Sequence, residues 1–462
     1  MSDAAAVPSV NTPPPTAVPS ARPWKRAIAW LVLLGPLFFL SYGWANSLAA
    51  ARVSVPSVVF GWESAIPFWA WTIVPYWSID AFYAVSLFIC RDRRELDRQA
   101  LRLLTAQFVA VTCFVLWPLR FSFTRPDSDG VFGWLFDVLL GFDKPFNQAP
   151  SLHIVLLVIL WLRFGAHLHG VWRWWLHGWA VLIAVSVLTT FQHHFFDVPT
   201  GLLAGFLCAW LWPMRVDPPW RGAVWTRERA RWRLAALYLA GAMSLALPAV
   251  VFSGAALWLL WPAVSLLLVA TNYALLGASG FQKQADGRLT VAAQWLYAPY
   301  LLAAWINSRW WTRRSPRPVP VCDDVWLGRV PTATERDGFD VVVDLAAELP
   351  LADARADDAV RPTLDLIAPA PTLLRAVAAD IEIARSRGRV LVCCALGYSR
   401  SASAVAAWLL HSGRAASVEL AIARVQAARP AVVLGEPHRQ ALQLAFDGGT
   451  PMHPAAMPAS SR

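Results

Sequence analysis

Charged residues are scarce in this chain of 462 residues, only 15% of which are Asp, Glu, Lys or Arg. Soluble globular proteins average about 25% charged residues. Hydrophobic residues make up 57% of the sequence, and they gather in long runs between residues 27 and 305 that contain almost no charge. This composition excludes a wholly soluble protein. It indicates a polytopic membrane protein, and residues 316–448, where charge is ordinary, indicate an attached soluble domain.

Cysteine is also rare, and the spacing of the six cysteines matches neither a zinc site nor a disulfide framework. We therefore expect no metal or other cofactor, and a reducing environment for Cys322, Cys393 and Cys394 in the soluble part. Acidic residues are outnumbered by basic ones, 30 to 40. Because the arginines cluster between apolar runs, as in cytoplasmic loops of membrane proteins, this charge predicts a membrane-surface role and no nucleic-acid partner.

The apolar runs predict eight spanning helices, since a helix needs about 20 residues to cross a bilayer. Every second loop is basic, which places those loops in the cytoplasm. A ninth run, 289–305, contains Pro299 and has basic residues on both flanks, so we expect an interfacial or re-entrant helix there. The alternative is that this run crosses the membrane, which would place the soluble domain on the outer side. The eight runs are 27–48, 67–89, 101–119, 151–166, 175–191, 198–214, 232–252 and 256–277.

These patterns divide the chain into five expected parts. Residues 1–24, rich in Pro, Ala and Ser, and residues 449–462 are expected to be disordered tails. Residues 25–214 are expected to form a six-helix membrane core. Residues 215–315 supply two further spanning helices and the interfacial helix, and residues 316–448 form the soluble domain.

Three polar stretches lie at the ends of the third to sixth predicted helices, all on the predicted outer side. Ionisable residues at membrane depth are costly and usually mark function. His193 and Asp197 are four residues apart, so a helix places them on one face, where Asp197 can orient the imidazole. The stretches read RFSFTRP (120–126), NQAPSLHIV (147–155) and FQHHFFDVPTG (191–201).

The remaining ionisable residues of these stretches differ in their expected roles. His153 could supply or accept a proton, and Arg120 and Arg125 could hold phosphate oxygens. For Arg120 a flanking residue that extends to the interface is an equal alternative. We interpret His194 and His167 as ordinary interfacial residues.

The three stretches resemble the type 2 phosphatidic acid phosphatase superfamily, whose motifs contain R-P, P-S-x-H and H-x-x-x-D in this order. The resemblance spans about residues 100–214. It implies that His193 takes the phosphoryl group, that His153 is the general acid for the leaving alcohol, and that Asp197 supports His193. Here the motifs read RP at 125–126, PSLH at 150–153 and HHFFD at 193–197.

The chain departs from this pattern at three positions. Pro118 stands where the family has a lysine, Val187 where it has an arginine, and Leu152 where it has a glycine. The PSLH sequence is closer to a branch resembling sphingomyelin and inositol-phosphorylceramide synthases, which move a phospho-headgroup between lipids. Hydrolysis of a lipid phosphate and headgroup transfer are therefore both open.

A different pattern, GRVLVCCALGYSRSASAVAAWLL, begins at residue 388 and reads as a buried strand, a tight loop and an apolar helix. The backbone amides between Ala395 and Arg400, with the helix N-terminus, can surround an anion. Gly397 permits the turn, and Arg400 offers a planar pair of donors to phosphate oxygens. In that field Cys394 is expected to be a thiolate and a nucleophile.

These residues resemble the cysteine-dependent dual-specificity phosphatases of the protein tyrosine phosphatase superfamily. The signature is a cysteine, five residues, an arginine, and a serine or threonine. Cys394, Arg400 and Ser401 fit it, and Gly397 and Ser399 also match. The resemblance implies that Arg400, Gly397 and Ser399 bind the phosphate and that Ser401 supports the nucleophile.

The resemblance spans about residues 316–446 and implies an α/β domain with a central sheet flanked by helices, following the all-α membrane bundle. It implies that Ser401 stabilises the departing thiolate and that Asp365, about thirty residues upstream of the nucleophile, is the general acid on a mobile loop. Cys393 stands where the family usually has a histidine.

The sequence thus predicts a bifunctional, multi-pass protein of a bacterial inner membrane. One site is an outward-facing histidine-dependent lipid phosphatase or phosphotransferase, and the other is a cytoplasmic cysteine-dependent phosphatase. Membrane lipids are the expected substrates, with a phosphoprotein as the alternative for the cysteine site. A non-enzymatic alternative is a membrane-anchored sensor that binds phosphate without turnover.

Overall fold

The structure is a computed structural model that describes residues 22–141 and 143–446. The tails predicted at 1–24 and 449–462 lie outside this range, apart from residues 22–24. The chain forms two compact units that divide between Cys208 and Ala209. Each is considered by itself.

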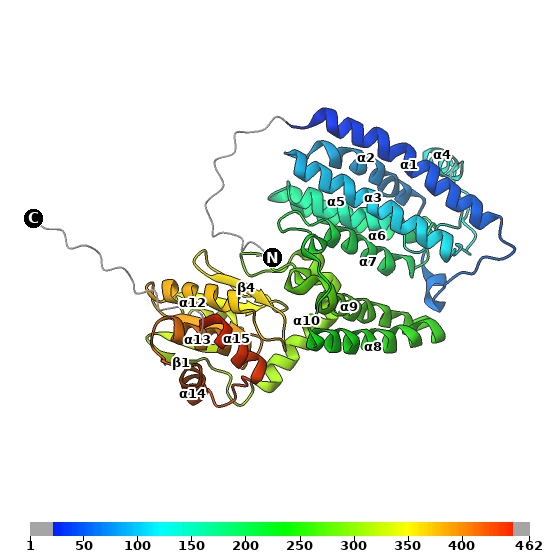
Figure 1. Cartoon of the computed structure of the whole chain (residues 1–462). Helices are drawn as coiled ribbons and strands as arrows, with labels where there is room; N and C mark the ends of the chain where they lie inside the picture. The colour runs from blue at the N-terminus through cyan, green and yellow to red at the C-terminus, as the bar shows by residue number, and fades with distance from the viewer. Residues whose placement is uncertain (1–21, 142, 447–462) are drawn as a thin grey trace, which may run out of the picture. The chain divides into compact units, whose positions relative to one another are not determined.

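The first unit is a bundle of helices (Figure 1). All six apolar runs predicted in this region form helices. Helix α3 begins with a side-chain cap, because Asp92 accepts a hydrogen bond from the backbone N–H of Glu95 at 2.8 Å. The six helices are α1 (Trp24–Ala50), α2 (Ile73–Phe88), α3 (Arg93–Leu116), α5 (Leu152–Gly165), α6 (Val171–Thr189) and α7 (Asp197–Leu211).

The connection between α3 and α5 contains a helix that the sequence pattern did not predict. Helix α4 (Gly130–Leu140) is apolar but has only 11 residues, too few to cross a bilayer, which needs about 20. Short 3-10 turns at Gly61–Ala65 and Ala70–Thr72 precede α2.

Five segments in the described part of the chain are helical, long and apolar enough to cross a membrane. They support the prediction of a membrane protein. How many helices cross, and in which direction, stays a prediction. The five segments are Trp24–Ala50, Arg93–Leu116, Val171–Thr189, Arg229–Phe252 and Gly254–Phe281.

The second unit begins with a helical part. Helix α8 (Arg229–Phe252) packs along α9 (Leu260–Thr271), and α9 continues through a π-turn at Asn272–Leu276 and a 3-10 turn at Gly277–Phe281. Helix α10 (Val291–Trp311) packs against α9, and it forms at the predicted ninth apolar run. Thr290 caps its N-terminus by accepting a hydrogen bond from the backbone of Ala293.

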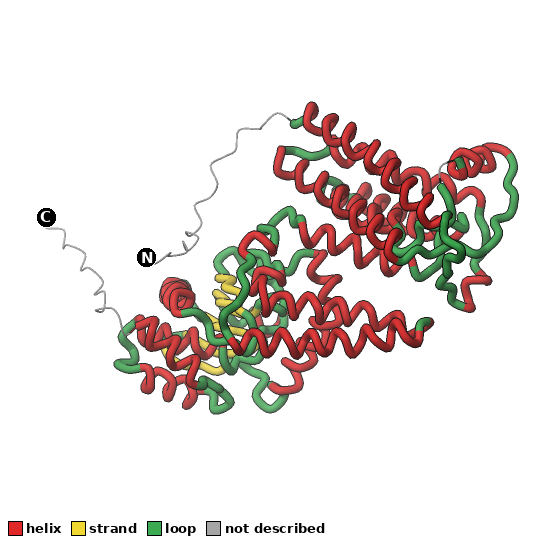
Figure 2. The backbone as a smooth tube through the Cα atoms, turned by 45° about the vertical axis from the view of Figure 1, so that its right-hand side comes forward, coloured by secondary structure: helices red, strands yellow, loops and turns green. Residues whose placement is uncertain are grey.

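An α/β domain follows, as predicted. Its five-stranded sheet has the order β1-β2-β5-β3-β4, with β1 antiparallel and the others parallel; Figure 2 shows the strands in yellow beside the helices in red. The strands are β1 (Val319–Cys322), β2 (Val325–Arg329), β3 (Val341–Ala346), β4 (Ala359–Thr363) and β5 (Val390–Cys394). The helices are α11 (Ala333–Arg336), α12 (Pro371–Arg385), α13 (Arg400–His411), α14 (Val418–Ala428) and α15 (Glu436–Phe446).

The two faces of this sheet are covered by different parts of the chain. Side chains of α12, α13, α14 and α15 pack on one face together with Val343, Val392 and Cys394. The opposite face carries Val342, Leu391 and Cys393 in a smaller apolar cluster, against which Ala304 of α10 packs. Successive strand residues point to opposite faces of the sheet, so parallel strands with apolar residues on both faces need a packing layer on each face. Helix α10 contributes the second of these layers.

A buried ion pair joins the turn before α10 to the sheet. Lys283 pairs with Asp344 of β3, and both side chains are fully buried. The Lys283 ammonium also donates to the carbonyl oxygens of Ala346 at 2.6 Å and Leu349 at 2.7 Å. Its three donors are therefore all used, which compensates the cost of burying the charge.

Candidate functional sites

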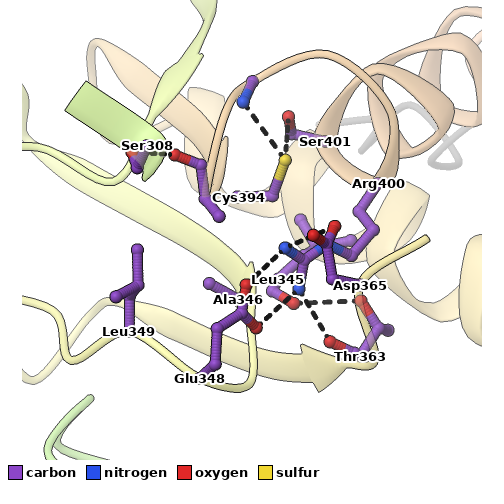
Figure 3. Close-up of polar contacts among 12 residues, drawn as sticks. Ser308, Leu345, Ala346, Glu348, Leu349, Thr363, Asp365, Cys394, Arg400 and Ser401 are labelled. Carbon is purple, nitrogen blue, oxygen red and sulfur yellow. Dashed lines mark hydrogen bonds and ion pairs between the residues drawn. The ribbon is translucent and has the colours of Figure 1, made fainter. Parts of the chain in front are cut away.

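The candidate nucleophile Cys394 lies at the end of β5, where the chain turns into a loop before α13. Its side chain is 2% exposed. The sulfur accepts hydrogen bonds from the backbone N–H of Gly397 at 3.3 Å and from the hydroxyl of Ser401 at 3.2 Å, as Figure 3 shows. The loop, residues 394–400, thus turns the amide of Gly397 toward the sulfur at the N-terminus of α13, an arrangement that favours an anion.

Arg400 is the first residue of α13, and its guanidinium is buried beside the loop (Figure 3). Nη1 and Nη2 donate to the carboxylate of Glu348 at 2.9 and 2.6 Å, and Nη1 also donates to the carbonyl oxygen of Thr363 at 2.9 Å. Nε is buried and has no hydrogen-bond partner among the described residues. Arg400 is therefore held rigidly and keeps one donor available for a ligand.

Glu348 is a functional residue that the sequence interpretation missed. Its carboxylate is 3% exposed. Burial opposes its ionisation, but the charge and hydrogen bonds of Arg400 outweigh burial, and the pKa of Glu348 is lowered. The available signal was its place just beyond β3, because the carboxyl ends of parallel strands meet at one edge of a sheet, where ligands bind.

Asp365 lies just beyond β4, at the same edge of the sheet. Its carboxylate Oδ1 is 3.0 Å from Nη2 of Arg400, and its side chain is 27% exposed. Burial raises the pKa of Asp365, Arg400 offsets part of this effect, and Glu348 adds to it. Leu366, the next residue, has a positive φ of 59°, a strained conformation for a residue with a Cβ. The structure thus brings the candidate acid to the candidate arginine.

The other candidate residues of this loop have distinct contacts. The Ser399 hydroxyl lies 2.7 Å from Nε2 of His438 in α15, another residue that the sequence interpretation missed. Cys393 belongs to the cluster on the opposite sheet face from Cys394, and burial raises the pKa of its thiol well above the usual value. Cys393 is therefore not placed to act as a redox partner of Cys394.

The first unit brings the predicted histidine residues together. His193 Nδ1 lies 3.1 Å from the Asp197 carboxylate, and both side chains are nearly fully buried. The ring of His153, at the start of α5, lies 6.4 Å from that of His193, centroid to centroid, and stacks on Tyr76 at 3.9 Å. The backbone N–H of Ser151 donates to the carbonyl of Asp197 at 3.1 Å, which ties the two motifs together.

Two cavities adjoin these histidines. His193 borders one of about 190 Å³, lined also by Arg125, Lys144 and Gln148. His153 borders one of about 290 Å³ that is lined mainly by apolar and aromatic side chains. Lys144, to which the sequence pattern gave no role, thus adds a second cation to the cavity beside His193, which we call the polar cavity and which Asp143 also lines.

The two candidate arginines differ in position. Arg125 lines the polar cavity, with its guanidinium 4.6 Å from the ring centroid of Phe136. Arg120 is exposed and does not line either cavity; its backbone N–H donates to the carbonyl of Pro56 at 2.9 Å. The structure therefore does not bring Arg120 to the histidines.

The interpretation of His194 as an interfacial residue is wrong, because its side chain is buried at 2% exposure. Nδ1 lies 2.8 Å from the Glu63 carboxylate, and Nε2 lies 3.1 Å from the backbone nitrogen of Ser122. The ring also stacks on Phe121 at 4.5 Å. His194 is thus held by two distant segments of the chain, which is a structural role. The distant Glu63 gave no sequence signal.

No family model matches the chain, and no curated protein matches it. Several phosphatases are among the solved structures that are similar to part of the chain. Human DUSP28 is 27% identical, with 29% of this chain and 94% of that chain covered and a TM-score of 0.26. Tk-PTP in its active form is 24% identical, with 29% and 99% covered and a TM-score of 0.25. PTPMT1 in complex with PI(5)P is 17% identical, with 28% and 92% covered and a TM-score of 0.23.

Gly397 is expected to be essential for the loop around Cys394. Its φ is +75°, and an added Cβ would lie 2.5 Å from the carbonyl carbon of Gly328, so Gly397→Ala must displace the loop. We expect Gly397→Ala to lower kcat/KM for Cys394-dependent turnover about 100-fold. The control is Gly413→Ala, because Gly413 has a similar φ of +70° with nothing within 4 Å of the added Cβ. Similar activity of the two variants in a steady-state assay would contradict this expectation.

Proposed function

We propose that the α/β domain is a cysteine-dependent phosphatase that hydrolyses phosphate monoesters. The observation that carries this proposal is the convergence of Cys394, Arg400 and Asp365 at one edge of the sheet. The sulfur accepts two hydrogen bonds in an anion-binding loop. The guanidinium keeps its Nε available, and the carboxyl with a raised pKa lies beside it.

This geometry supports a two-step reaction. The Cys394 thiolate attacks phosphorus, an S–P bond forms, and the P–O bond to the leaving group breaks while Asp365 gives its proton to the leaving oxygen. Water then attacks phosphorus, the ionised Asp365 takes a proton from it, and the S–P bond breaks. The Ser401 hydroxyl, 3.2 Å from the sulfur, stabilises the departing thiolate. The products are an alcohol and inorganic phosphate.

Arg400 has to exchange partners during this reaction. Without substrate it is bonded to Glu348 and paired with Asp365. A bound phosphate can use the available Nε and compete with Asp365 for Nη2, while Glu348 continues to fix the guanidinium plane. Asp365 is then released toward the leaving oxygen. The substrate is a phosphate monoester on a lipid or on a protein.

Cys394→Ser is expected to abolish turnover of 4-nitrophenyl phosphate by the full chain, since serine is a poor nucleophile at its usual pKa. Asp365→Asn is expected to retain a fraction of the activity and to change its pH dependence. Because protonated Asp365 is the active form, wild-type kcat/KM should fall as the pH rises through the raised pKa of Asp365, and the variant should lack that fall. Wild-type turnover by Cys394→Ser would disprove the assignment, and phosphate binding without any turnover in the wild type would favour a sensor.

We further propose that the first unit is a histidine-dependent enzyme acting on lipid phosphates. The specific observation is the buried His193–Asp197 pair beside a cavity that contains Arg125 and Lys144. Two cations can hold phosphate oxygens, Asp197 orients His193 for attack on phosphorus, and His153 is near enough to protonate a leaving alcohol. The mainly apolar cavity beside His153 suits a lipid chain. Hydrolysis and headgroup transfer both fit this arrangement.

His193→Ala and His153→Ala are each expected to abolish this lipid activity and to leave Cys394-dependent turnover unchanged. His194→Ala serves as the comparison, because its ring is buried but points to Glu63 and Ser122. It is expected to lower the melting temperature and to retain activity at low temperature. Incubation of the full chain with labelled phospholipids, followed by product analysis, distinguishes free phosphate from a new phospholipid. Loss of activity in His194→Ala alone, with His193→Ala active, would show that the wrong histidine was chosen.

We propose that the histidine site faces outward and that the cysteine site lies in the cytoplasm of a bacterial inner membrane. The basic loops support this orientation. Both ends of α10 also contact the same α/β domain: Gly287, just before it, accepts a hydrogen bond from the backbone of Leu351 at 2.9 Å, and Ser308, near its end, donates to the carbonyl of Ala395 at 2.5 Å. A helix whose two ends meet one soluble domain is not expected to cross a bilayer.

A membrane-impermeant thiol reagent is therefore expected to leave Cys394 and Cys322 unlabelled in intact spheroplasts and to label Cys322 after permeabilisation. Cys322 is the better reporter, since it is partly exposed whereas Cys394 is buried. A cysteine placed at Asp129, in a cysteine-free background, should be labelled in the intact cells. Labelling of Cys322 in sealed cells would place both sites on the same side.

A further inference from the structure

The helical part of the second unit contacts each of the three loops that form the candidate phosphatase site. We name these loops the acid loop (364–370), the glutamate loop (346–349) and the phosphate loop (394–400). The contacts come from residues 273–312, which we call the frame. The frame precedes the α/β domain in the chain and lies outside the region whose sequence resembles phosphatases.

The first contact is to the acid loop. Tyr273, in the π-turn after α9, is buried, and its hydroxyl donates to the backbone carbonyl oxygen of Asp365 at 3.0 Å. The ring is itself fixed by stacking on Tyr238 of α8, with the centroids 5.4 Å apart. Since Leu366 holds a strained positive φ, the backbone at this point needs an external restraint. Tyr273 supplies it.

The second contact is to the glutamate loop. The Lys283 ammonium bonds the carbonyls on both sides of Glu348, those of Ala346 and Leu349, and pairs with Asp344 in the strand before them. Glu348 in turn fixes Arg400 through two hydrogen bonds. Lys283 therefore fixes the backbone of the glutamate loop on both sides of the residue that holds the Arg400 guanidinium.

The third contact is to the phosphate loop. Ser308 of α10 is fully buried, and its hydroxyl donates to the carbonyl of Ala395, the residue after the nucleophile. The Tyr398 hydroxyl in the same loop donates to the backbone carbonyl of Trp311 at 3.2 Å. These bonds fix the outer side of the loop, whose Gly397 amide donates to the Cys394 sulfur on the inner side.

We propose that the frame is a positioning element of the phosphatase site, with Tyr273 the positioning residue for the general acid Asp365 and Ser308 the positioning residue for the phosphate loop. The inference rests on the proposed phosphatase function. The frame touches neither the sulfur nor the available Nε of Arg400. Its effect is to hold the backbone of these loops in place. The acid loop contains the strained Leu366, and the phosphate loop depends on the positive φ of Gly397. The α/β domain without residues 273–312 is then an incomplete enzyme.

The two positioning residues predict different kinetic effects, which a general loss of stability would not produce. Tyr273→Phe removes one hydroxyl and loosens only the acid loop. Protonation by Asp365 matters more for phenyl phosphate than for 4-nitrophenyl phosphate, because 4-nitrophenolate leaves more readily without a proton. We expect kcat for phenyl phosphate to fall about tenfold and kcat for 4-nitrophenyl phosphate to fall less than about twofold. Ser308→Ala is expected to raise KM for both substrates by the same factor.

The experiment measures kcat, KM and pH profiles of full-length variants in detergent. The matched control is Tyr297→Phe, which removes a buried hydroxyl of the same frame that bonds Asn272 and the carbonyl of Gly280 and contacts no catalytic loop. It should leave the ratio of the two kcat values unchanged. Adding Tyr273→Phe to Asp365→Asn should have little further effect on that ratio, because both changes act on one step.

The outcomes distinguish a failure of the proposed phosphatase function from a failure of the proposed positioning role. If the wild-type chain shows no Cys394-dependent turnover, the proposed function fails. If the wild type is active but Tyr273→Phe keeps the wild-type ratio and pH profile, and Ser308→Ala keeps the wild-type KM, the positioning role is overturned. Equal losses on both substrates in Tyr273→Phe and Tyr297→Phe also overturn it, because they show a stability effect only. Should Tyr273→Phe fail to fold, the KM of Ser308→Ala decides alone.

Discussion

The cysteine site depends on one buried charge, the guanidinium of Arg400. Burying a cation costs several kcal/mol unless it is paired and hydrogen-bonded. Glu348 and the carbonyl of Thr363 meet that requirement, and they come from the ends of β3 and β4, the two strands beyond β5. The parallel sheet order is thus what brings the arginine, its holder and the candidate acid to one edge. Nε of Arg400 has no hydrogen-bond partner in the described part of the chain, and it is the donor that the proposed phosphate would use.

The same constraint explains why the frame matters. The carboxylate that holds Arg400 lies in a loop, and a loop holds a charge in place only if its own backbone is fixed. Lys283 fixes that backbone through two carbonyls, and its own burial requires Asp344. Two buried ion pairs, Lys283–Asp344 and Arg400–Glu348, therefore connect the turn before α10 with the candidate phosphate site. Each member is costly alone and stable only with its neighbours, as expected for buried polar networks.

The sequence alone predicted the helices, the α/β domain and the candidate residues that lie within contiguous motifs. Apolar runs mark helices because each run is long, and the loop around Cys394 is recognisable because its parts are neighbours in the chain. Glu348, His438, Glu63 and the contacts of the frame with the α/β domain were missed for the opposite reason. Their partners are 39 to 131 residues away, and no local pattern records such a pairing. Helix α4 was missed because 11 residues are too few for a span, and His194 was misread because its burial depends on two distant segments.

The two candidate sites meet the same chemical requirement in different surroundings. Each needs a nucleophile next to cations that hold phosphate oxygens, and a group that donates a proton to the leaving oxygen. In the histidine site the carboxylate of Asp197 supports the nucleophile, because an imidazole gains positive charge as it attacks. The cysteine site has the opposite arrangement, in which backbone amides, the Ser401 hydroxyl and the helix N-terminus surround the sulfur. These donors stabilise a thiolate, whose negative charge decreases as it attacks phosphorus. The opposite charge changes of the two nucleophiles therefore account for the acidic neighbour of His193 and for the amide and hydroxyl donors around the Cys394 sulfur.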